Sequence, residues 1–403
     1  MIEPVALDIL LHGRRIGAIA RLEGDKSIFT FDESYLEDGT RPTLSLSYKG
    51  ASGEILNLPR PRQTVVEPFF SNLLPEGTLR DYLARQAGTK KVRDYPLLLQ
   101  LGQDLPGAVM AVPTDDSLSG EIAEAFAPSQ NKPPALRFSL AGVQLKFSAL
   151  RNKGKEGGLA IPMSGVGGDW IVKLPSPSHP NVPEAEFAAM SLAAKIGMDV
   201  PELDLVPIDN LTGLPVGIKV HGDKAYAIRR FDRGPDGPIH IEDFAQVFNV
   251  YASDKYENAS FWRILAILAI ETDEASIVEF VRRLTYSVLI GNGDMHLKNW
   301  SLIYPDRRSA LLAPTHDMLS TVPYIPNDLL ALKLRRSKDW SSFTYEELEK
   351  VADKARVPSH LVVKTARETV ERFDQAWNEE KTHLPFPSSV AAAIDKHRAS
   401  LKV

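Results

Sequence analysis

The 403-residue sequence contains no cysteine. This absence excludes a disulfide-stabilised fold and a thiol nucleophile, and it disfavours a structural zinc site. Long apolar stretches are also missing, because the longest apolar run, Ile264 to Ile270, is too short to span a bilayer. The N-terminus shows no signal segment. The sequence therefore predicts a cytoplasmic protein that does not associate with a membrane.

A net positive charge is missing as well. The chain has 47 Lys and Arg residues against 52 Asp and Glu residues, which gives a net charge of −5. Because charge-driven nucleic-acid binding needs a net basic surface, the composition does not favour a chain that coats nucleic acid by itself. A hydrophobic content of 43% and a charged content of 25% describe an ordinary globular protein, and the length suffices for two or three domains.

The most informative stretch is Gly291-Asn-Gly-Asp-Met-His-Leu-Lys-Asn299. A kinase-type site needs a carboxylate that accepts the proton of the attacking hydroxyl, and an amide oxygen and a second carboxylate that hold Mg²⁺. Asp294 and Asn299 have the Asp-x-x-x-x-Asn spacing of the first two groups, and Asp317 lies 18 residues further on. The alternative interpretation is a surface turn whose Asp and Asn only cap and bend the chain.

The flanking residues favour the catalytic interpretation. An apolar stripe at helical spacing precedes the loop and consists of Ile277, Val281, Leu284 and Val288. It predicts a buried helix, and the segment 300–304 after the loop predicts a strand. A loop between two packed elements can hold its side chains still.

Lys173 is the candidate for the ATP-binding lysine, because it ends an apolar strand as the lysine of the kinase Val-Ala-Ile-Lys strand does. The alternative is a strand-end lysine that faces water. A predicted helix with Pro183 in its first turn follows and stops before Gly197. Glu186 on this helix shares a face with Met190, which turns its carboxylate inward and predicts a pair with Lys173.

Two glycine-containing segments compete as the phosphate-binding loop. Ser139-Leu-Ala-Gly-Val-Gln-Leu-Lys146 has a single glycine and offers backbone N–H groups together with Gln144 or Lys146. The run 165–168 has more glycines, but it ends five residues before Lys173 and fits a hairpin turn better. The earlier segment is therefore favoured. In a two-lobed kinase the strand 226–230 would lead into the hinge, where Phe231 could pack on the adenine; the alternative is an ordinary exposed edge of a sheet.

The overall pattern predicts an α+β protein with a two-lobed, protein-kinase-like fold, a β-rich first lobe and an all-helical second lobe, preceded by an extra β-rich domain. The predicted boundaries are 1–115 for the N-terminal domain, 116–135 for a linker, 136–235 for the first lobe and 236–403 for the second lobe. The N-terminal domain includes a predicted strand at 44–48 and offers no obvious chemistry. The predicted helices of the second lobe are 241–250, 260–270, 276–290, 344–354, 358–377 and 388–401. The basic run 333–338 is interpreted as a solvated face.

Taken in order, these motifs resemble those of the HipA family, the serine/threonine-kinase toxins of HipBA toxin–antitoxin modules. The matching segments are Ser139 to Lys146, Ile171-Val-Lys173, Glu186, Arg230-Phe-Asp-Arg233, Gly293 to Asn299 and His316-Asp317. The resemblance extends from about residue 136 to 320, and more loosely to the N-terminal domain. It departs from the family at Arg229, where relatives commonly have a glutamate.

The resemblance implies a role for each matching residue. Asp294 is the catalytic base, and Asn299 and Asp317 hold magnesium. Ser139 matches the serine that the family autophosphorylates, which expels the loop and inactivates the kinase, because a dianionic phosphate is repelled by the ATP phosphates. The implied ATP-binding residues are Lys173, Glu186, Ser139, Gly142, Val143, Gln144, Lys146, Arg229, Phe231, His296 and Lys298.

The resemblance also implies the function. It predicts an ATP- and Mg²⁺-dependent serine/threonine protein kinase that acts as a toxin, phosphorylates an aminoacyl-tRNA synthetase and stops translation, which leads to growth arrest and persistence. A HipB-like helix-turn-helix antitoxin would neutralise it and would supply its only contact with DNA.

Two other functions remain open. The first is a small-molecule kinase of the aminoglycoside or choline kinase type, against which Ser139 and the N-terminal domain argue. The second is a non-catalytic, partner-binding member, against which the intact Asp294, Asn299 and Asp317 argue.

Overall fold

The computed structural model describes residues 6–77, 80, 93–114, 145–151, 158–162, 167–176, 179–214, 220–257 and 259–403. Several predicted features lie outside these residues: the linker 116–135 and Ser139, Gly142, Val143 and Gln144 of the predicted phosphate loop. The boundaries at 115 and 135 therefore stay predictions.

The N-terminal domain is built on a five-stranded sheet with the order β4-β3-β2-β1-β5. Its elements are β1 (Ala6–Leu11), β2 (Arg14–Leu22), β3 (Lys26–Phe31), α1 (Glu33–Leu36), β4 (Arg62–Gln63), α2 (Pro68–Ser71), α4 (Asp94–Leu101) and β5 (Val109–Pro113). Alternation of apolar residues puts Leu7, Ile9 and Leu11 of β1 on the buried face. The predicted strand 44–48 is wrong: residues Leu46–Tyr48 form a 3₁₀ turn, whose N-cap Ser45 accepts a hydrogen bond from the backbone of Ser47.

The first kinase lobe is a six-stranded sheet with the order β10-β7-β6-β8-β11-β9, and α6 packs against it. Its elements are β6 (Lys146–Arg151), β7 (Leu159–Ala160), β8 (Trp170–Lys173), α6 (Val182–Lys195), β9 (Leu203–Pro207), β10 (Leu211–Thr212) and β11 (Lys224–Arg229). Helix α6 has Pro183 in its first turn and ends before Gly197, whose φ of 90° suits glycine. The helix that the sequence predicts between Pro183 and Gly197 is therefore confirmed.

The second lobe is mainly helical and also carries a three-stranded sheet, β14-β15-β16. Its elements are β14 (His240–Asp243), α7 (Phe244–Val247), α8 (Phe261–Glu271), α9 (Glu274–Leu289), β15 (Ser301–Tyr304), β16 (Leu311–Leu312), α10 (Tyr345–Ala355), α11 (Ser359–Glu380) and α12 (Ser388–Ser400). The predicted helix 241–250 is wrong in its first part, because 240–243 pair with β15. Asp243 and Gln246 then form a capping box that starts α7 only at Phe244.

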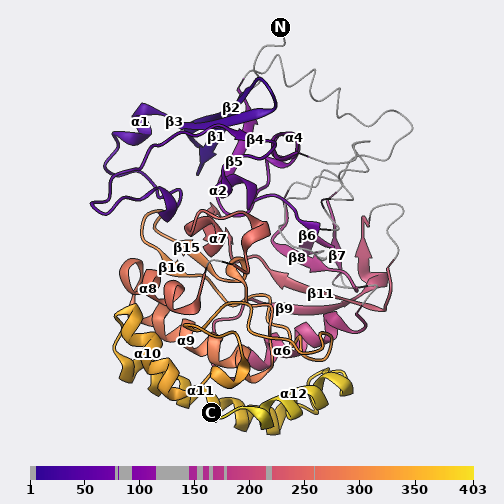
Figure 1. Cartoon of the computed structure of the whole chain (residues 1–403). Helices are drawn as coiled ribbons and strands as arrows, with labels where there is room; N and C mark the ends of the chain where they lie inside the picture. The colour runs from indigo at the N-terminus through magenta and orange to yellow at the C-terminus, as the bar shows by residue number, and fades with distance from the viewer. Residues whose placement is uncertain are drawn as a thin grey trace.

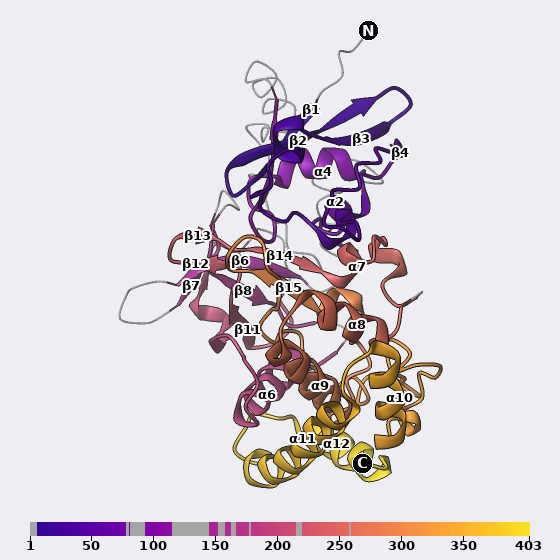
Figure 2. The same ribbon diagram turned by 90° about the vertical axis from the view of Figure 1, so that its left-hand side faces the viewer.

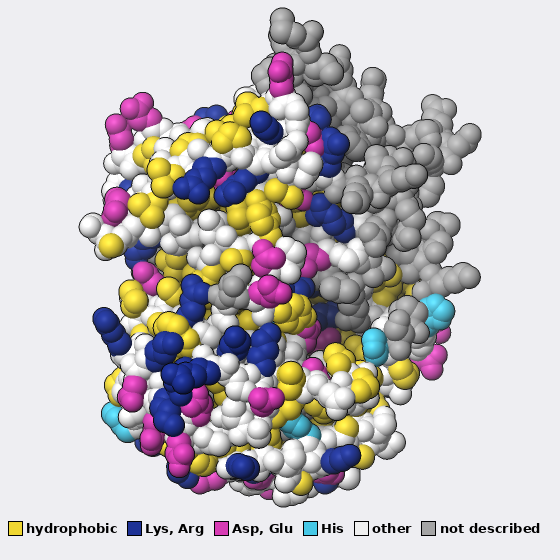
Figure 3. Space-filling model, viewed as in Figure 1, with side chains coloured by type: hydrophobic (Ala, Val, Ile, Leu, Met, Phe, Trp, Pro, Cys, Tyr) yellow, Lys and Arg dark blue, Asp and Glu magenta, His cyan; other side chains and the backbone are white. Residues whose placement is uncertain are grey.

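The N-terminal domain lies at the top of the molecule in Figures 1 and 2. Below it, the strands β6, β8 and β11 of the first lobe lie on one side and α8 of the second lobe on the other, with α10, α11 and α12 toward the bottom. Figure 3 shows Lys and Arg side chains gathered at the lower left of this face, over α8 and α10. Lys333 and Arg336 are exposed, as expected for the basic run. In the part of the chain that the structure describes, no helix is long and apolar enough to cross a membrane.

Candidate active site

The loop that carries Asp294 begins where α9 ends, as the apolar stripe predicts. Gly291 has a φ of 67°, and a Cβ atom there would lie 2.8 Å from the side chain of Val322, so only glycine fits without strain. Thr321 fastens the loop, because its Oγ1 accepts a hydrogen bond of 2.6 Å from the backbone of Gly293. The helix and this contact hold Asp294 at a defined place.

The predicted site residues that the structure describes line one cavity of about 320 Å³. Its polar lining includes Lys146, Lys173, Glu186, Asp294, His296, Lys298, Asn299 and Asp317. Lys173 Nζ lies 2.5 Å from Glu186 Oε1 and also contacts Asp317 Oδ1. The predicted Lys173–Glu186 pair is therefore present. Lys173 comes from β8, Glu186 from α6, and Asp317 from the segment after β16.

Burial and charge set the protonation of this cluster. Burial by itself lowers the pKa of Lys173, but Asp317 and Glu186 outweigh it and hold the pKa above its ordinary value. Burial raises the pKa of Glu186 to about 7 against the opposing effect of Lys173. Burial favours a higher pKa for Asp317 too, yet Lys173 and Lys146 bring that pKa well below its usual range. Asp317 is therefore the charged carboxylate of the cluster.

Asn299 and Asp294 are joined through the loop backbone. Asn299 Nδ2 donates a hydrogen bond of 2.7 Å to the main-chain oxygen of Asp294. This bond turns the amide oxygen of Asn299 away from that main-chain oxygen. The Asp294 side chain is 51% exposed at the mouth of the cavity and accepts a hydrogen bond from the hydroxyl of Tyr256. Desolvation at this place raises the pKa of Asp294, and the bond from Tyr256 opposes that effect.

His296 is buried, and Lys298 is bonded to other residues of the chain. Burial lowers the pKa of His296 to about 3, so its ring is neutral near pH 7. Lys298 Nζ lies 2.8 Å from Asp243 Oδ2 and from the main-chain oxygen of Asn72, and 3.0 Å from Asn72 Oδ1. These contacts connect the catalytic loop to the N-terminal domain. The nucleotide contacts predicted for both residues stay predictions.

The hinge residues line the outer part of the same cavity. Phe231 lies with its ring centroid 5.4 Å from that of His316, and Ile171 and Ile228 add apolar surface. Arg229 is also among the lining residues, but its side chain is 54% exposed and its Nη1 lies 3.8 Å from Glu202 Oε2. Phe231 is thus placed to contact a flat apolar group, whereas the side chain of Arg229 faces solvent.

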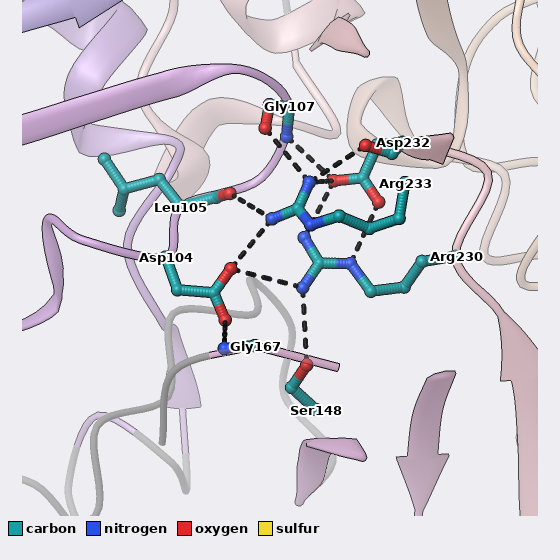
Figure 4. Close-up of polar contacts among 8 residues, drawn as sticks. All are labelled: Asp104, Leu105, Gly107, Ser148, Gly167, Arg230, Asp232 and Arg233. Atoms are coloured by element: carbon teal, nitrogen blue, oxygen red, sulfur yellow. Dashed lines mark hydrogen bonds and ion pairs between the residues drawn. The ribbon is translucent and has the colours of Figure 1, made fainter. Parts of the chain in front are cut away.

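The Arg230-Phe-Asp-Arg233 motif joins the hinge to the N-terminal domain (Figure 4). Arg233 Nη2 lies 2.8 Å from Asp104 Oδ1, and Asp232 Oδ2 accepts a hydrogen bond of 2.8 Å from the backbone of Gly107. Arg230, whose side chain is 2% exposed, pairs with Asp232 at 2.8 Å. The network ties the strand that ends at the hinge to the loop before β5.

The sequence analysis missed one wall of the cavity. Asn72, Leu73 and Glu76 of the N-terminal domain line it, together with Lys255 and Tyr256 of the segment between α7 and α8. No motif or spacing marks these residues, because they reach the site only through contacts between distant parts of the chain. The expectation that the N-terminal domain offers no chemistry is therefore too narrow.

The donor set suits magnesium and a nucleotide triphosphate. Asp317 and the amide oxygen of Asn299 offer oxygen donors of the kind that Mg²⁺ prefers, and they could hold this ion together with the phosphates of a nucleotide. Among the described residues, no three His, Asp or Glu side chains form a group that could hold a metal ion by themselves. Lys173 and Lys146 supply positive charge for those phosphates.

The fold and this cluster together define a protein-kinase-like scaffold. Comparison with known families shows which one: the HipA N-terminal domain matches residues 7–112, and the HipA-like C-terminal domain matches residues 138–377. The chain belongs to the HipA family of kinases, and the predicted fold class is confirmed.

Two relatives and one solved structure illustrate this membership. The chain is 52% identical over 400 residues to Y4dM of Sinorhizobium fredii, whose name marks it only as a candidate kinase, and the match covers 98% of this chain and 97% of that protein. It is 26% identical to the serine/threonine-protein kinase toxin HipA of Shewanella oneidensis, over 91% of this chain and 88% of that protein. The structure of Shewanella oneidensis HipA in complex with HipB and operator DNA has the same fold, with a TM-score of 0.70, 24% identity, and coverage of 98% of this chain and 96% of that one.

Proposed function

We propose that this protein is an ATP- and Mg²⁺-dependent serine/threonine protein kinase. The observation that carries the proposal is the convergence of Lys173, Glu186, Asp317, Asn299 and Asp294 in one cavity. These residue types at these positions are the ones that phosphoryl transfer requires, since catalysis there consists almost entirely of positioning and charge stabilisation.

Each of these residues has a definite task in the proposed reaction. Bound ATP supplies the phosphoryl group. Lys173, held by Glu186, places its ammonium group against the phosphates, and Asp317 and Asn299 hold the metal. Asp294 accepts the proton of the acceptor hydroxyl, and its exposure at the mouth of the cavity lets an acceptor reach it from solvent.

We further propose that the kinase is the toxin of a HipBA-like module. Its membership in the HipA family and its similarity to a toxin of that name support this role. The proposed acceptor is an aminoacyl-tRNA synthetase, and the proposed partner is a HipB-like helix-turn-helix antitoxin through which the protein contacts DNA. Autophosphorylation of Ser139, which lies outside the described residues, is the proposed means of inactivation.

Radiolabelled ATP tests the kinase proposal. The wild-type protein with Mg²⁺ should incorporate phosphate at Ser139, and Asp294→Asn should reduce the rate by ~10³-fold, because the proton acceptor is lost. Asp306→Asn is the matched control, since Asp306 caps a surface turn by accepting bonds from the backbones of Arg308 and Ser309.

Equal labelling of Asp294→Asn and the wild-type protein would show that Asp294 is not the proton acceptor.

The class of acceptor is tested separately, by offering aminoacyl-tRNA synthetases, choline and aminoglycosides to the wild-type protein. Transfer to a synthetase supports the toxin function, and transfer only to a small molecule contradicts it.

A further inference from the structure

The hydroxyl of Tyr256 stands at the carboxylate that an acceptor must reach. It donates a hydrogen bond to Asp294 Oδ1, the group to which the proposed function assigns the acceptor proton. In phosphoryl transfer the acceptor hydroxyl makes the same kind of contact with the catalytic carboxylate. The place of the acceptor hydroxyl is therefore taken by a hydroxyl of this chain.

Contacts other than the one with Asp294 aim Tyr256 at this place. Its neighbour Lys255 lies 2.9 Å from Glu76 of the N-terminal domain, and Lys338 Nζ donates a 3.1 Å hydrogen bond to the main-chain oxygen of Tyr256. The ring of Tyr256 packs edge-on against His296, with 5.0 Å between the ring centroids. Three parts of the chain thus hold the tyrosine over the catalytic loop.

The same side chain is placed so that it can leave. Tyr256 is 39% exposed, whereas Tyr286 and Tyr304 are fully buried and donate their hydroxyl hydrogen bonds inside the core. Moving Tyr256 away from Asp294 disrupts no apolar core, since it belongs to none of the buried clusters. An occupant of this kind suits a position that another hydroxyl must enter.

We propose that Tyr256 is an internal stand-in for the acceptor hydroxyl, which holds Asp294 in position until an acceptor displaces the phenol. The inference rests on the proposed kinase function and goes beyond it, because it assigns a gating role to a residue outside the recognised motifs. Tyr256 is a positioning residue, and its hydroxyl no longer contacts Asp294 when phosphoryl transfer takes place.

Steady-state kinetics with a generic hydroxyl acceptor, dephosphorylated casein, test the displacement. In Tyr256→Phe the KM for casein should fall about tenfold, the factor expected for one hydrogen bond to a charged group, while kcat stays unchanged.

Tyr251→Phe is the matched control. Tyr251 lies in the same segment, and its hydroxyl donates to the main-chain oxygen of Val66, 3.2 Å away and outside the cavity. This variant should keep the wild-type KM and kcat for casein.

A second measurement needs neither nucleotide nor acceptor. N-acetylimidazole acylates free phenols, and peptide mapping by mass spectrometry gives the rate at each tyrosine. Acylation of Tyr256 should be at least several-fold faster in Asp294→Ala than in the wild-type protein, because the hydroxyl loses its acceptor. The rate at Tyr251 should be the same in both proteins and serves as the internal reference.

The outcomes separate the two proposals. If the wild-type protein phosphorylates casein but Tyr256→Phe leaves its KM unchanged or lowers kcat alone, the stand-in role is wrong and the kinase function stands. Equal acylation of Tyr256 in Asp294→Ala and the wild-type protein also overturns it. A wild-type protein that transfers phosphate neither to casein nor to itself removes the kinase function, and the inference falls with it.

Discussion

Asp317 contributes to the site through its backbone conformation and through its carboxylate. Its φ of 55° lies in the left-handed region, which Asp and Asn enter more readily than other non-glycine residues. Its carboxylate contacts the ammonium of Lys173, and the attraction of Lys173 and Lys146 outweighs burial and keeps the pKa well below the ordinary range. A single residue thus provides both an unusual backbone turn and a charged carboxylate in the cavity.

Substitution of Asp317 separates these two contributions. Asp317→Asn keeps the left-handed backbone but loses the charge that faces Lys173, so it should lower phosphate transfer by roughly 10²-fold or more. Asp317→Ala should lose the same activity and, in addition, about 1 kcal/mol of stability from the strained backbone. Phosphate incorporation and thermal unfolding of both variants check this. An alanine variant as stable as the asparagine variant would contradict the backbone argument.

At the scale of the element, the short helix α2 brings the N-terminal domain to the catalytic loop. Asn72 at its C-terminus is 2% exposed and donates to the main-chain oxygens of Pro68, at 2.9 Å, and Val250, at 2.8 Å. Its own oxygens accept from Lys298. One asparagine therefore links α2, the segment after α7 and the loop that carries Asp294.

Asn72→Ala should destabilise the protein by about 2 kcal/mol, because it leaves the buried carbonyl of Val250 without this donor and removes one acceptor of Lys298. Phosphate transfer should fall as well, since the catalytic loop loses an anchor. Urea unfolding and phosphate incorporation measure the two effects. Asn57→Ala, at an exposed position, should stay within about 0.5 kcal/mol of the wild type. Equal stability of the two variants would show that the link carries no energy.

At the scale of the whole molecule, the N-terminal domain docks on the kinase lobes through a buried carboxylate. Glu242 of β14 is 1% exposed and accepts hydrogen bonds from Ser45 Oγ, at 2.5 Å, the backbone of Leu46, at 2.9 Å, and the hydroxyl of Tyr304, at 2.5 Å. Burial raises its pKa from 4.5 to about 7, and the bonds from Ser45 and Tyr304 oppose that shift.

The raised pKa predicts the pH dependence of stability. The folded protein keeps a proton on Glu242 that the unfolded chain loses, so this contribution is complete below about pH 4.5 and is lost as the pH rises through about 7. Glu242→Gln should remove this pH dependence. The slopes of unfolding free energy against pH for the wild-type protein and the variant should then differ by up to about 1.4 kcal/mol per pH unit. Urea unfolding at several pH values between 5 and 7.5 checks this. Parallel curves for the two proteins would contradict the shift.

The sequence by itself determined the features that depend on short-range order. The Asp294 to Asn299 spacing, the strand that ends at Lys173 and the helix of Glu186 lie within segments whose apolar periodicity and turn residues specify their local structure. The motif set also led to the correct family and fold class. Periodicity does not distinguish a short helical turn from an edge strand, which is why the predicted helix at 241–243 and the predicted strand at 44–48 are wrong.

Only the tertiary structure decided what surrounds those features. Lys298 meets Asn72 across 226 positions of the chain, and Tyr256 meets Asp294 across 38, through contacts that no local pattern encodes. Such contacts form because separate hydrophobic cores bring the N-terminal domain, the α7–α8 segment and the catalytic loop together. The chemistry of the catalytic loop is therefore readable from the residue order, whereas the wall of the site and the occupant of its mouth follow from packing.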